Sequence, residues 1–219
     1  MKTVIVREAL IRNMPGDSSS GFHAIILASG RSSRMKCEKS RLPWLGGVPL
    51  LSWMVQALSA AGWQAKAVVG PESFSRWDAA LPAGCAVLNP DPSRGKTSSL
   101  ACGVEMLPPN AKWILISGVD QPRLLSLYHR LRDEAERCSR QIIVPTHAGR
   151  RGHPVVLSGG LRDKLLNLDE HAHGLRGLLD AHPLEIYRLP EGDPEERQWD
   201  LNTPDAYDEA LQHFQKNCG

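Results

Sequence analysis

Short apolar runs alternate with helix-patterned stretches from residue 23 to residue 145 of this chain. Apolar runs of this kind, joined by helices and free of repeats, are typical of parallel strands buried on both faces. We expect strands at 23–28, 65–69, 85–88, 112–117 and 141–145, and helices at 49–61, 72–80, 97–106 and 122–136. The alternation therefore predicts an α/β fold, a three-layer sandwich around a mostly parallel sheet.

The remaining segments predict a second group of elements and an N-terminal extension. We expect strands at 154–157 and 184–189, short helices near 159–167 and 174–180, and a final helix at 204–216. Pro204 after Asn202-Thr203 is a good helix-start signal. Residues 13–21 are polar and rich in turn-forming residues, as linkers are. We therefore expect an extension and linker over residues 1–21 and a single domain over residues 22–219.

Composition excludes several classes of protein. The chain has 219 residues, 42% of them hydrophobic, and a formal net charge of +2, which neither favours nor opposes a polyanionic partner. Its apolar runs are too short to span a bilayer, and the N-terminus does not resemble a secretory signal. The five cysteines are scattered without a C-x-x-C pair, and the six tryptophans form no evident stacking platform. We expect a cytoplasmic protein that binds neither membranes nor nucleic acid.

The loop that follows the first expected strand is rich in positive charge. Ser29-Gly30 allow a sharp turn and the close approach of a ligand. Five cations then face a single acidic residue, Glu38; they are Arg31, Arg34, Lys36, Lys39 and Arg41. Backbone amides together with converging Arg and Lys side chains suit a triphosphate. A solvated charged loop is the alternative that this segment leaves open.

An acidic residue follows the strand expected at 112–117. Asp120 lies at the tip of a tight turn, where a carboxylate is well placed to hold Mg²⁺ together with phosphate oxygens. The alternative is that Asp120 caps the helix expected to begin at Pro122. Asp200 and Asn202 alternate on a short extended segment, so both side chains should face the same way. Either could complete the metal shell, while residues 202–205 also read as a capped helix start.

Two further segments carry candidate binding residues. Arg150 and Arg151 beside Gly152 suit a phosphate or carboxylate, and His153 is either a ligand contact or a structural histidine. The stretch from Asn89 to Leu100 reads, taken alone, as a loop and a helix start.

Several of these motifs resemble those of one family, the MobA-like NTP transferases. The first loop is similar to the signature L-A-[AG]-G-x-[SG]-x-R-M-G-x-x-K and departs from it at Ser29 and Lys36. The matching positions are Leu27, Ala28, Gly30, Ser32, Arg34, Met35, Lys39, Leu42 and Pro43. Further similarities follow in the family's order, at Asn89-Pro90 with Gly95 and Ser98-Ser99-Leu100, at V-D-Q-P, at R-G-H-P-V and at D-L-N-T-P. The resemblance covers roughly residues 22–210, and R-G-H-P-V is typical of the molybdenum cofactor cytidylyltransferase branch.

This resemblance implies a Rossmann-like, GT-A-like nucleotidyltransferase that uses Mg²⁺ to transfer a nucleoside monophosphate from CTP to molybdopterin cofactor. A molybdoenzyme would be the client of the product. The residues implied to be catalytic are Arg34, Lys39 and Asp120, and the metal ligands are Asp120, Asp200 and Asn202. Those implied to bind nucleotide are Leu27, Ala28, Ser29, Gly30, Arg34, Lys39, Asn89, Gly95, Ser98 and Ser99. Those implied to bind the acceptor are Arg151, Gly152 and His153.

Two other readings of the function stay open. One is a transferase that uses GTP or another NTP, or a different phosphorylated acceptor. The other is a non-catalytic carrier of the finished molybdenum cofactor. Ser29 favours CTP over GTP, because a side chain at this position narrows the pocket toward a pyrimidine.

Overall fold

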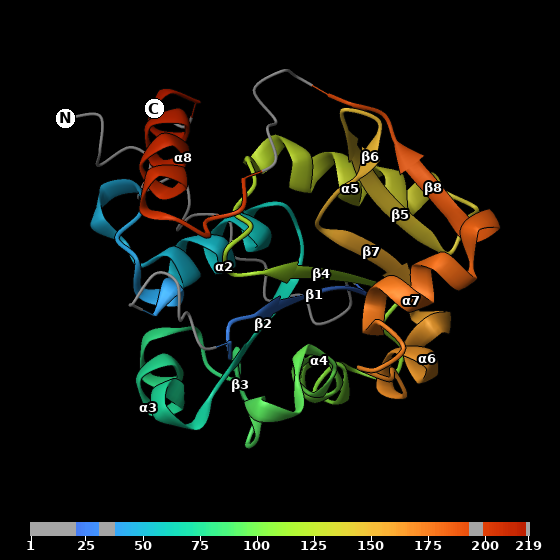
Figure 1. Ribbon diagram of the computed structural model, residues 1–219, viewed down its shortest axis with the longest axis horizontal. Helices are drawn as coiled ribbons and strands as arrows, with labels where there is room; N and C mark the ends of the chain where they lie inside the picture. The colour runs from blue at the N-terminus through green and yellow to red at the C-terminus, as the bar shows by residue number, and fades with distance from the viewer. Residues whose placement is uncertain (1–20, 31–37, 193–198, 218–219) are drawn as a thin grey trace.

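A twisted central sheet forms the middle layer of the protein (Figure 1). The computed structural model describes residues 21–30, 38–192 and 199–217. The sheet has eight strands in the order β3-β2-β1-β4-β7-β5-β6, and β8 pairs with β5 off this path. Their bounds are β1 Phe22–Leu27, β2 Gln64–Val69, β3 Ala86–Leu88, β4 Trp113–Gly118, β5 Ile142–His147, β6 Arg150–Arg151, β7 Val155–Ser158 and β8 Ile186–Leu189.

Most of the strand pairs are parallel. β1 pairs in parallel with β2 and β4, β2 with β3, and β5 with β8, whereas β7 runs antiparallel to β4 and β5. Strand β6 pairs antiparallel with β5. The expected α/β fold with a mostly parallel sheet is confirmed.

Helices cover both faces of this sheet. Their bounds are α2 Leu50–Ala60, α3 Pro71–Ala80, α4 Lys96–Glu105, α5 Leu125–Arg137, α6 Arg162–Leu166, α7 Gly174–Ala181 and α8 Pro204–Asn217. Ala24 and Ile26 of β1 join a core cluster that includes α2, α5 and α8, while Ile25 joins a second cluster with α4, α6 and α7. Successive β1 residues thus point to opposite faces, and β1 is buried on both because each face has its own helical layer.

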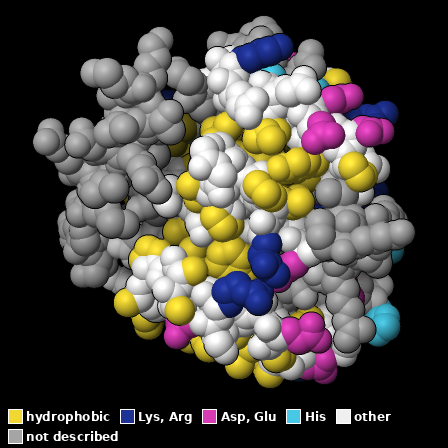
Figure 2. All heavy atoms as spheres, turned by 90° about the vertical axis from the view of Figure 1, so that its left-hand side faces the viewer, with side chains coloured by type: hydrophobic (Ala, Val, Ile, Leu, Met, Phe, Trp, Pro, Cys, Tyr) yellow, Lys and Arg dark blue, Asp and Glu magenta, His cyan; other side chains and the backbone are white. Residues whose placement is uncertain are grey.

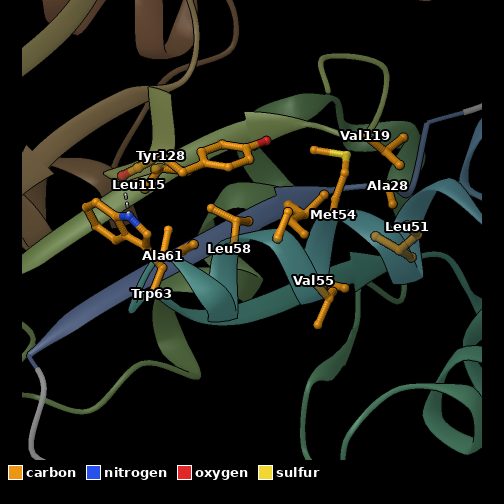
Figure 3. Packing of buried hydrophobic residues seen from close by; sticks show 14 of the residues in the cluster. Ala28, Leu51, Met54, Val55, Leu58, Ala61, Trp63, Leu115, Val119 and Tyr128 are labelled. Carbon is orange, nitrogen blue, oxygen red and sulfur yellow. Dashed lines mark hydrogen bonds between the residues drawn. The ribbon is translucent and has the colours of Figure 1, made fainter. Parts of the chain in front are cut away.

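The core between α2 and the sheet is densely packed (Figure 3). Met54 and Leu58 of α2 are fully buried, and Tyr128 of α5 lies beside them. The indole Nε1 of Trp63 donates to the Tyr128 carbonyl at 3.2 Å, so the polar atom of a buried ring is satisfied. No described helix is both long and apolar enough to cross a membrane.

The side of the molecule that carries α2, α3 and α8 is turned toward the viewer in Figure 2. Hydrophobic side chains gather in the middle of this face, with basic side chains just below them. Beneath it, the Trp44 ring packs against Trp53, Tyr207 and Phe214 with ring centroids 5.1–6.0 Å apart. Some exposed apolar area is usual for a folded protein, and the aromatic rings join α8 to the body of the fold.

Two local features differ from the sequence-based expectation, and the direction of one strand was left open by it. Helix α5 begins at Leu125, not at Pro122; its N-cap residue Leu124 has an extended ψ of 149°, so residues 122–124 precede the helix. Strand β6 was not expected; it forms a hairpin with β5 through Ala148 and Gly149, whose φ values are both positive, as a tight hairpin turn requires. Strand β7 is antiparallel because a short hairpin, without a crossover helix, leads into it.

The sheet register brings two loops together. Leu27, the last residue of β1, lies opposite Gly118, the last residue of β4. The amide of Val119 donates to the Leu27 carbonyl at 3.0 Å, which extends the pairing past the strand ends. The carboxyl ends of the two central strands therefore present residues 28–30 and 119–121 side by side, where open α/β sheets bind ligands.

Candidate active site

A cavity of about 640 Å³ lies at these strand ends. Residues from the loop after β1, the turn after β4, the N-terminus of α4, the segment before α8 and the α6–α7 region line it. Its lining includes the predicted residues Leu27, Ser29, Gly30, Lys39, Gly95, Ser99, Asp120, His153, Asp200 and Asn202. Arg34, expected to be catalytic and to bind nucleotide, lies outside the described residues, as do Arg31, Lys36 and nearly all of the expected extension.

Lys39 is at the centre of the polar part of this cavity. It begins the short 3-10 helix η1 (Lys39–Arg41), and its Nζ donates to Asp120 Oδ2 at 2.9 Å and to Asn202 Oδ1 at 2.8 Å. Its side chain is 12% exposed and that of Asp120 is 32% exposed, so the ion pair is partly shielded from water. The structure thus brings together a cation and two oxygen donors from three segments that are far apart in sequence.

The turn after β4 is shaped to hold Asp120. A Cβ at Gly118 would come within 2.5 Å of Asp120 Oδ1, so only glycine permits this approach of the carboxylate. Gln121 Oε1 accepts from the Gly118 amide at 3.3 Å, and Gln121 Nε2 donates to Asp200 Oδ1 at 2.9 Å. Gly118 and Gln121 were not predicted as site residues, although both flank the aspartate of the V-D-Q-P motif.

The alternative role of Asp120 as a helix cap is wrong. Helix α5 has Leu124 at its N-cap position and begins five residues beyond Asp120. At the other segment the expected capped helix start is present, because Thr203 Oγ1 accepts from the Ala206 amide at 3.2 Å at the start of α8. Asp200 and Asn202 both line the cavity, which agrees with the expectation that they face the same way.

A chain of polar side chains supports the wall formed by the first loop. Ser29 Oγ lies 2.6 Å from Ser99 Oγ on α4, and Asn89 Nδ2 donates to Ser99 Oγ at 2.9 Å and to Ser98 Oγ at 3.1 Å. Asn89 is buried behind this wall, so it orients the two serines from below the cavity surface. The structure therefore groups the predicted residues Ser29, Asn89, Ser98 and Ser99.

The N-terminus of α4 carries a partner that sequence reasoning missed. Glu170, from the segment before α7, accepts from the Thr97 amide through Oε2 at 2.8 Å. This backbone hydrogen bond is the main reason why the pKa of Glu170 is lowered from its ordinary value. Gly95 has a φ of 95°, and a Cβ there would lie 2.6 Å from Glu170 Cδ, so glycine is needed at position 95. No local sequence signal links Glu170 to a helix 73 residues away.

The predicted acceptor residues are only partly brought to the cavity. His153 lines it, and burial followed by the nearby Arg123 charge lowers the pKa of its imidazole. Arg151 and Gly152 are not among the lining residues; Arg151 is hydrogen-bonded to Asp180 of α7, and the Gly152 amide donates to the Pro145 carbonyl at 2.8 Å. Arg123, whose side chain is 1% exposed, donates to the His153 carbonyl and was not predicted as a site residue.

The residues present suit a divalent cation whose shell is completed by substrate. Among the described residues, no group of three or more His, Cys, Asp or Glu side chains is arranged as a complete metal site. Mg²⁺, however, needs only one or two carboxylates when phosphate oxygens and water supply the rest. Asp120 and Asp200 could provide the carboxylates and Asn202 an amide oxygen, and all three line the cavity.

Solved structures with the same fold come from bacteria and archaea. The fold is similar to that of Rv0371c from Mycobacterium tuberculosis H37Rv, at 24% identity and a TM-score of 0.72 over 87% of this chain and 98% of that one. A second structure of Rv0371c, a complex with manganese, aligns at 23% identity and a TM-score of 0.66 over the same 87% and 98%.

Two archaeal proteins share this fold as well. A nucleotidyl transferase from Methanothermobacter thermautotrophicus aligns at 20% identity and a TM-score of 0.72 over 90% of this chain and 98% of that one. Molybdopterin-guanine dinucleotide biosynthesis protein A from Archaeoglobus fulgidus aligns at 19% identity and a TM-score of 0.65, over 89% and 100%.

The sequence itself gives the family. No curated protein matches the chain at a significant level. The model of the MobA-like NTP transferase domain matches residues 24–186, which span β1 to the start of β8. The match covers well over half of the chain and all of the cavity-lining residues except Asp200 and Asn202. This protein belongs to the MobA-like NTP transferase family.

Proposed function

We propose that this protein transfers CMP from CTP to molybdopterin cofactor, with release of pyrophosphate. The observation that carries the proposal is the cluster of Lys39, Asp120 and Asn202 at the carboxyl ends of β1 and β4. Family membership supplies the NTP and the phosphorylated acceptor. The R-G-H-P-V string and Ser29 favour the cytidylyl branch over the guanylyl branch.

In the proposed reaction an acceptor phosphate oxygen attacks the α-phosphorus of CTP. The bond from that phosphorus to the bridging oxygen of the β-phosphate breaks, and pyrophosphate leaves. Such chemistry depends mainly on positioning and charge neutralisation. Residues 28–30 and Lys39 would hold the triphosphate, while Ser29 and Ser99 would border the base, with Asn89 and Ser98 supporting them from behind the cavity wall. His153, from the loop before β7, would contact the acceptor.

Asp120, with Asp200 or Asn202, would hold Mg²⁺, which would neutralise phosphate charge and orient the oxygens that it binds. Lys39 already places a positive charge between Asp120 and Asn202. Two cations cannot occupy the same oxygens at low cost, so with a cation held by Asp120 and Asn202 the Lys39 ammonium would contact the triphosphate instead. Lys39 would therefore contact the carboxylate before the metal–nucleotide complex binds, and phosphate afterwards.

The test is pyrophosphate release by the full chain with each of the four NTPs, with Mg²⁺ and with molybdopterin cofactor. We expect release with CTP that needs both the acceptor and the metal. A thermal-shift screen of the same NTPs reports binding independently, because a ligand that binds the folded state stabilises it. Binding of molybdopterin cofactor without turnover of any NTP would favour a carrier role instead. Release that requires GTP or a different phosphorylated acceptor would reassign the substrate.

A further inference from the structure

Arg123 is a buried charge that the proposed chemistry does not use directly. It lies between the turn after β4 and the first residue of α5, and its side chain is only 1% exposed. Burial lowers the pKa of its guanidinium, whereas the nearby Asp200 and Asp120 charges favour the charged form. Arginine keeps its proton in proteins, so a charge in this place must be balanced by hydrogen bonds.

The hydrogen bonds of Arg123 reach three separate segments. Its Nε donates to the His153 carbonyl at 3.0 Å. One terminal nitrogen donates to the Pro122 carbonyl at 2.8 Å and to the Trp199 carbonyl at 2.6 Å. The other lies 4.0 Å from Asp200 Oδ1. The turn after β4, the loop before β7 and the segment before α8 therefore meet at one guanidinium group.

The segments held by Arg123 carry different parts of the cavity wall. Asp200 follows Trp199 directly, and its Oδ1 also accepts from Gln121 Nε2 at 2.9 Å. The Leu201 amide donates to the Asp120 carbonyl at 2.8 Å, so the same segment is tied to the acidic turn. His153, whose carbonyl accepts from Arg123 Nε, is another lining residue of the cavity. Arg123 thus sits between the candidate metal ligands and the candidate acceptor contact.

We propose that Arg123 is a positioning residue that fixes the distance between the metal-binding carboxylates and the acceptor-binding loop. This inference rests on the proposed function for its kinetic part only. The guanidinium is planar and rigid, with donors that point in fixed directions, so it can bridge three carbonyls at once. A lysine carries all of its donors on a single nitrogen, so it cannot bridge the same three carbonyls. An acceptor loop that shifts by about 1 Å loses alignment with the reacting phosphorus, which costs rates of order 100-fold.

The variants Arg123→Lys and Arg123→Met test the proposal, with Arg162→Met as the matched control. Arg162, which is half-buried, likewise donates to two backbone carbonyls, those of Leu107 and Pro108, but it lies at the start of α6 and is not among the cavity-lining residues. Mn²⁺ affinity is measured by electron paramagnetic resonance and nucleotide affinity by calorimetry without metal. KM and kcat are measured with the acceptor varied.

Both Arg123 variants should lower Mn²⁺ affinity about 10-fold or more and raise the KM for the acceptor. Metal-free nucleotide affinity should change less than 3-fold, and Arg162→Met should change none of these quantities even if it lowers the melting temperature. Wild-type Mn²⁺ affinity and unchanged acceptor KM in a folded Arg123→Lys or Arg123→Met variant would overturn the proposal. If the wild-type chain has no turnover with any NTP, the proposed function fails while the Mn²⁺ comparison still decides this one.

Hydrogen exchange in the wild-type chain gives a second measurement that needs no variant. Because Arg123 joins the two segments, Mn²⁺ binding should slow amide exchange at residues 152–153 as well as at 199–202. Protection confined to residues 118–121 and 199–202 would show that metal binding is not coupled to the acceptor loop. That result would overturn the proposal even if both Arg123 variants failed to fold.

Discussion

At the scale of single residues, the turn after β4 positions the carboxylates of the candidate site. Gly118 removes the side chain that would collide with Asp120, and Gln121 holds Asp200 from the same turn. The sequence identified Asp120, Asp200 and Asn202 as a group, because they follow expected strands or precede an expected helix. It did not identify Gln121 as the partner of Asp200, because a hydrogen bond between residues 79 positions apart leaves no local pattern.

Asp120→Asn should abolish metal-dependent turnover while it leaves the fold intact. The amide keeps the shape of the side chain but loses the charge that attracts the cation, so we expect a fall in turnover of about 100-fold or more. The lost ion pair with Lys39 should lower stability by only about 0.2–1 kcal/mol, since the carboxylate is partly exposed. Pyrophosphate release over a range of Mg²⁺ concentrations, beside thermal melting, measures both effects. Asp133→Asn, at an exposed position on α5, is the control, and turnover preserved in Asp120→Asn would contradict the metal role.

Ser29→Gly should shift nucleotide preference toward GTP. Ser29 lines the cavity and its hydroxyl lies 2.6 Å from that of Ser99, so its loss both widens the pocket and breaks a polar chain. We expect the wild-type preference for CTP to shrink by about 10-fold or more. Ser29→Ala separates the two causes, because it removes the hydroxyl and keeps the β-carbon. Competition of the four NTPs for one labelled nucleotide gives the order, and tighter binding of GTP than of CTP by the wild type would move the chain to the guanylyl branch.

At the scale of elements, the sequence predicted most strands and helices to within three residues. The apolar runs that predicted the central strands are buried on both faces of the sheet by helices, as the pattern of consecutive apolar residues requires. The start of α5 was wrong because Pro122 looked like the first residue of a helix, whereas Arg123 is drawn into the site by three backbone carbonyls. The antiparallel direction of β7 could not be predicted, since an apolar run does not record which way its neighbours run.

The β5–β6 hairpin contains a residue that its backbone does not favour. Ala148 has a φ of 48°, in a region where a β-carbon costs about 1 kcal/mol and where Asn before Gly is preferred. Ala148→Asn should therefore raise the free energy of unfolding by about 0.5–1 kcal/mol. Urea denaturation at neutral pH measures the change. Ala83→Asn is the matched control, because it is exposed but has no positive φ, and equal effects of the two substitutions would show that the turn is not the cause.

At the scale of the whole molecule, a buried histidine should make stability depend on pH. His23 of β1 is 2% exposed, and neither ring nitrogen has a hydrogen-bond partner among the described residues. Burial, and then the charges of Lys66 and Arg162, lower the pKa of its imidazole from the ordinary 6.5. Below about pH 6.5 the His23 imidazole is protonated in the unfolded chain but stays neutral in the folded chain. The free energy of unfolding is therefore highest above that pH and decreases as the pH falls below it. His153, whose pKa is also lowered, acts in the same direction.

His23→Leu should flatten this pH dependence. We expect the loss of unfolding free energy between pH 7.5 and pH 5.5 to be smaller in the variant than in the wild type, with a remainder due in part to His153. Urea denaturation at several pH values measures it. His147→Leu, at an exposed position, controls for the loss of a surface histidine. A wild-type pH profile retained in His23→Leu would show that the buried imidazole does not cause the dependence.

The contact of Lys39 with Asn202 has a consequence for the synthesis of this protein. The two residues are 163 positions apart, and a ribosome adds about 5–20 residues each second. Lys39 and the strand before it therefore leave the ribosome roughly 10–30 s before Asn202 does. Until then Lys39 of the nascent chain lacks the amide oxygen to which it donates in the folded protein. The polar site is therefore completed only after synthesis of the segment before α8, long after its first residues have been made.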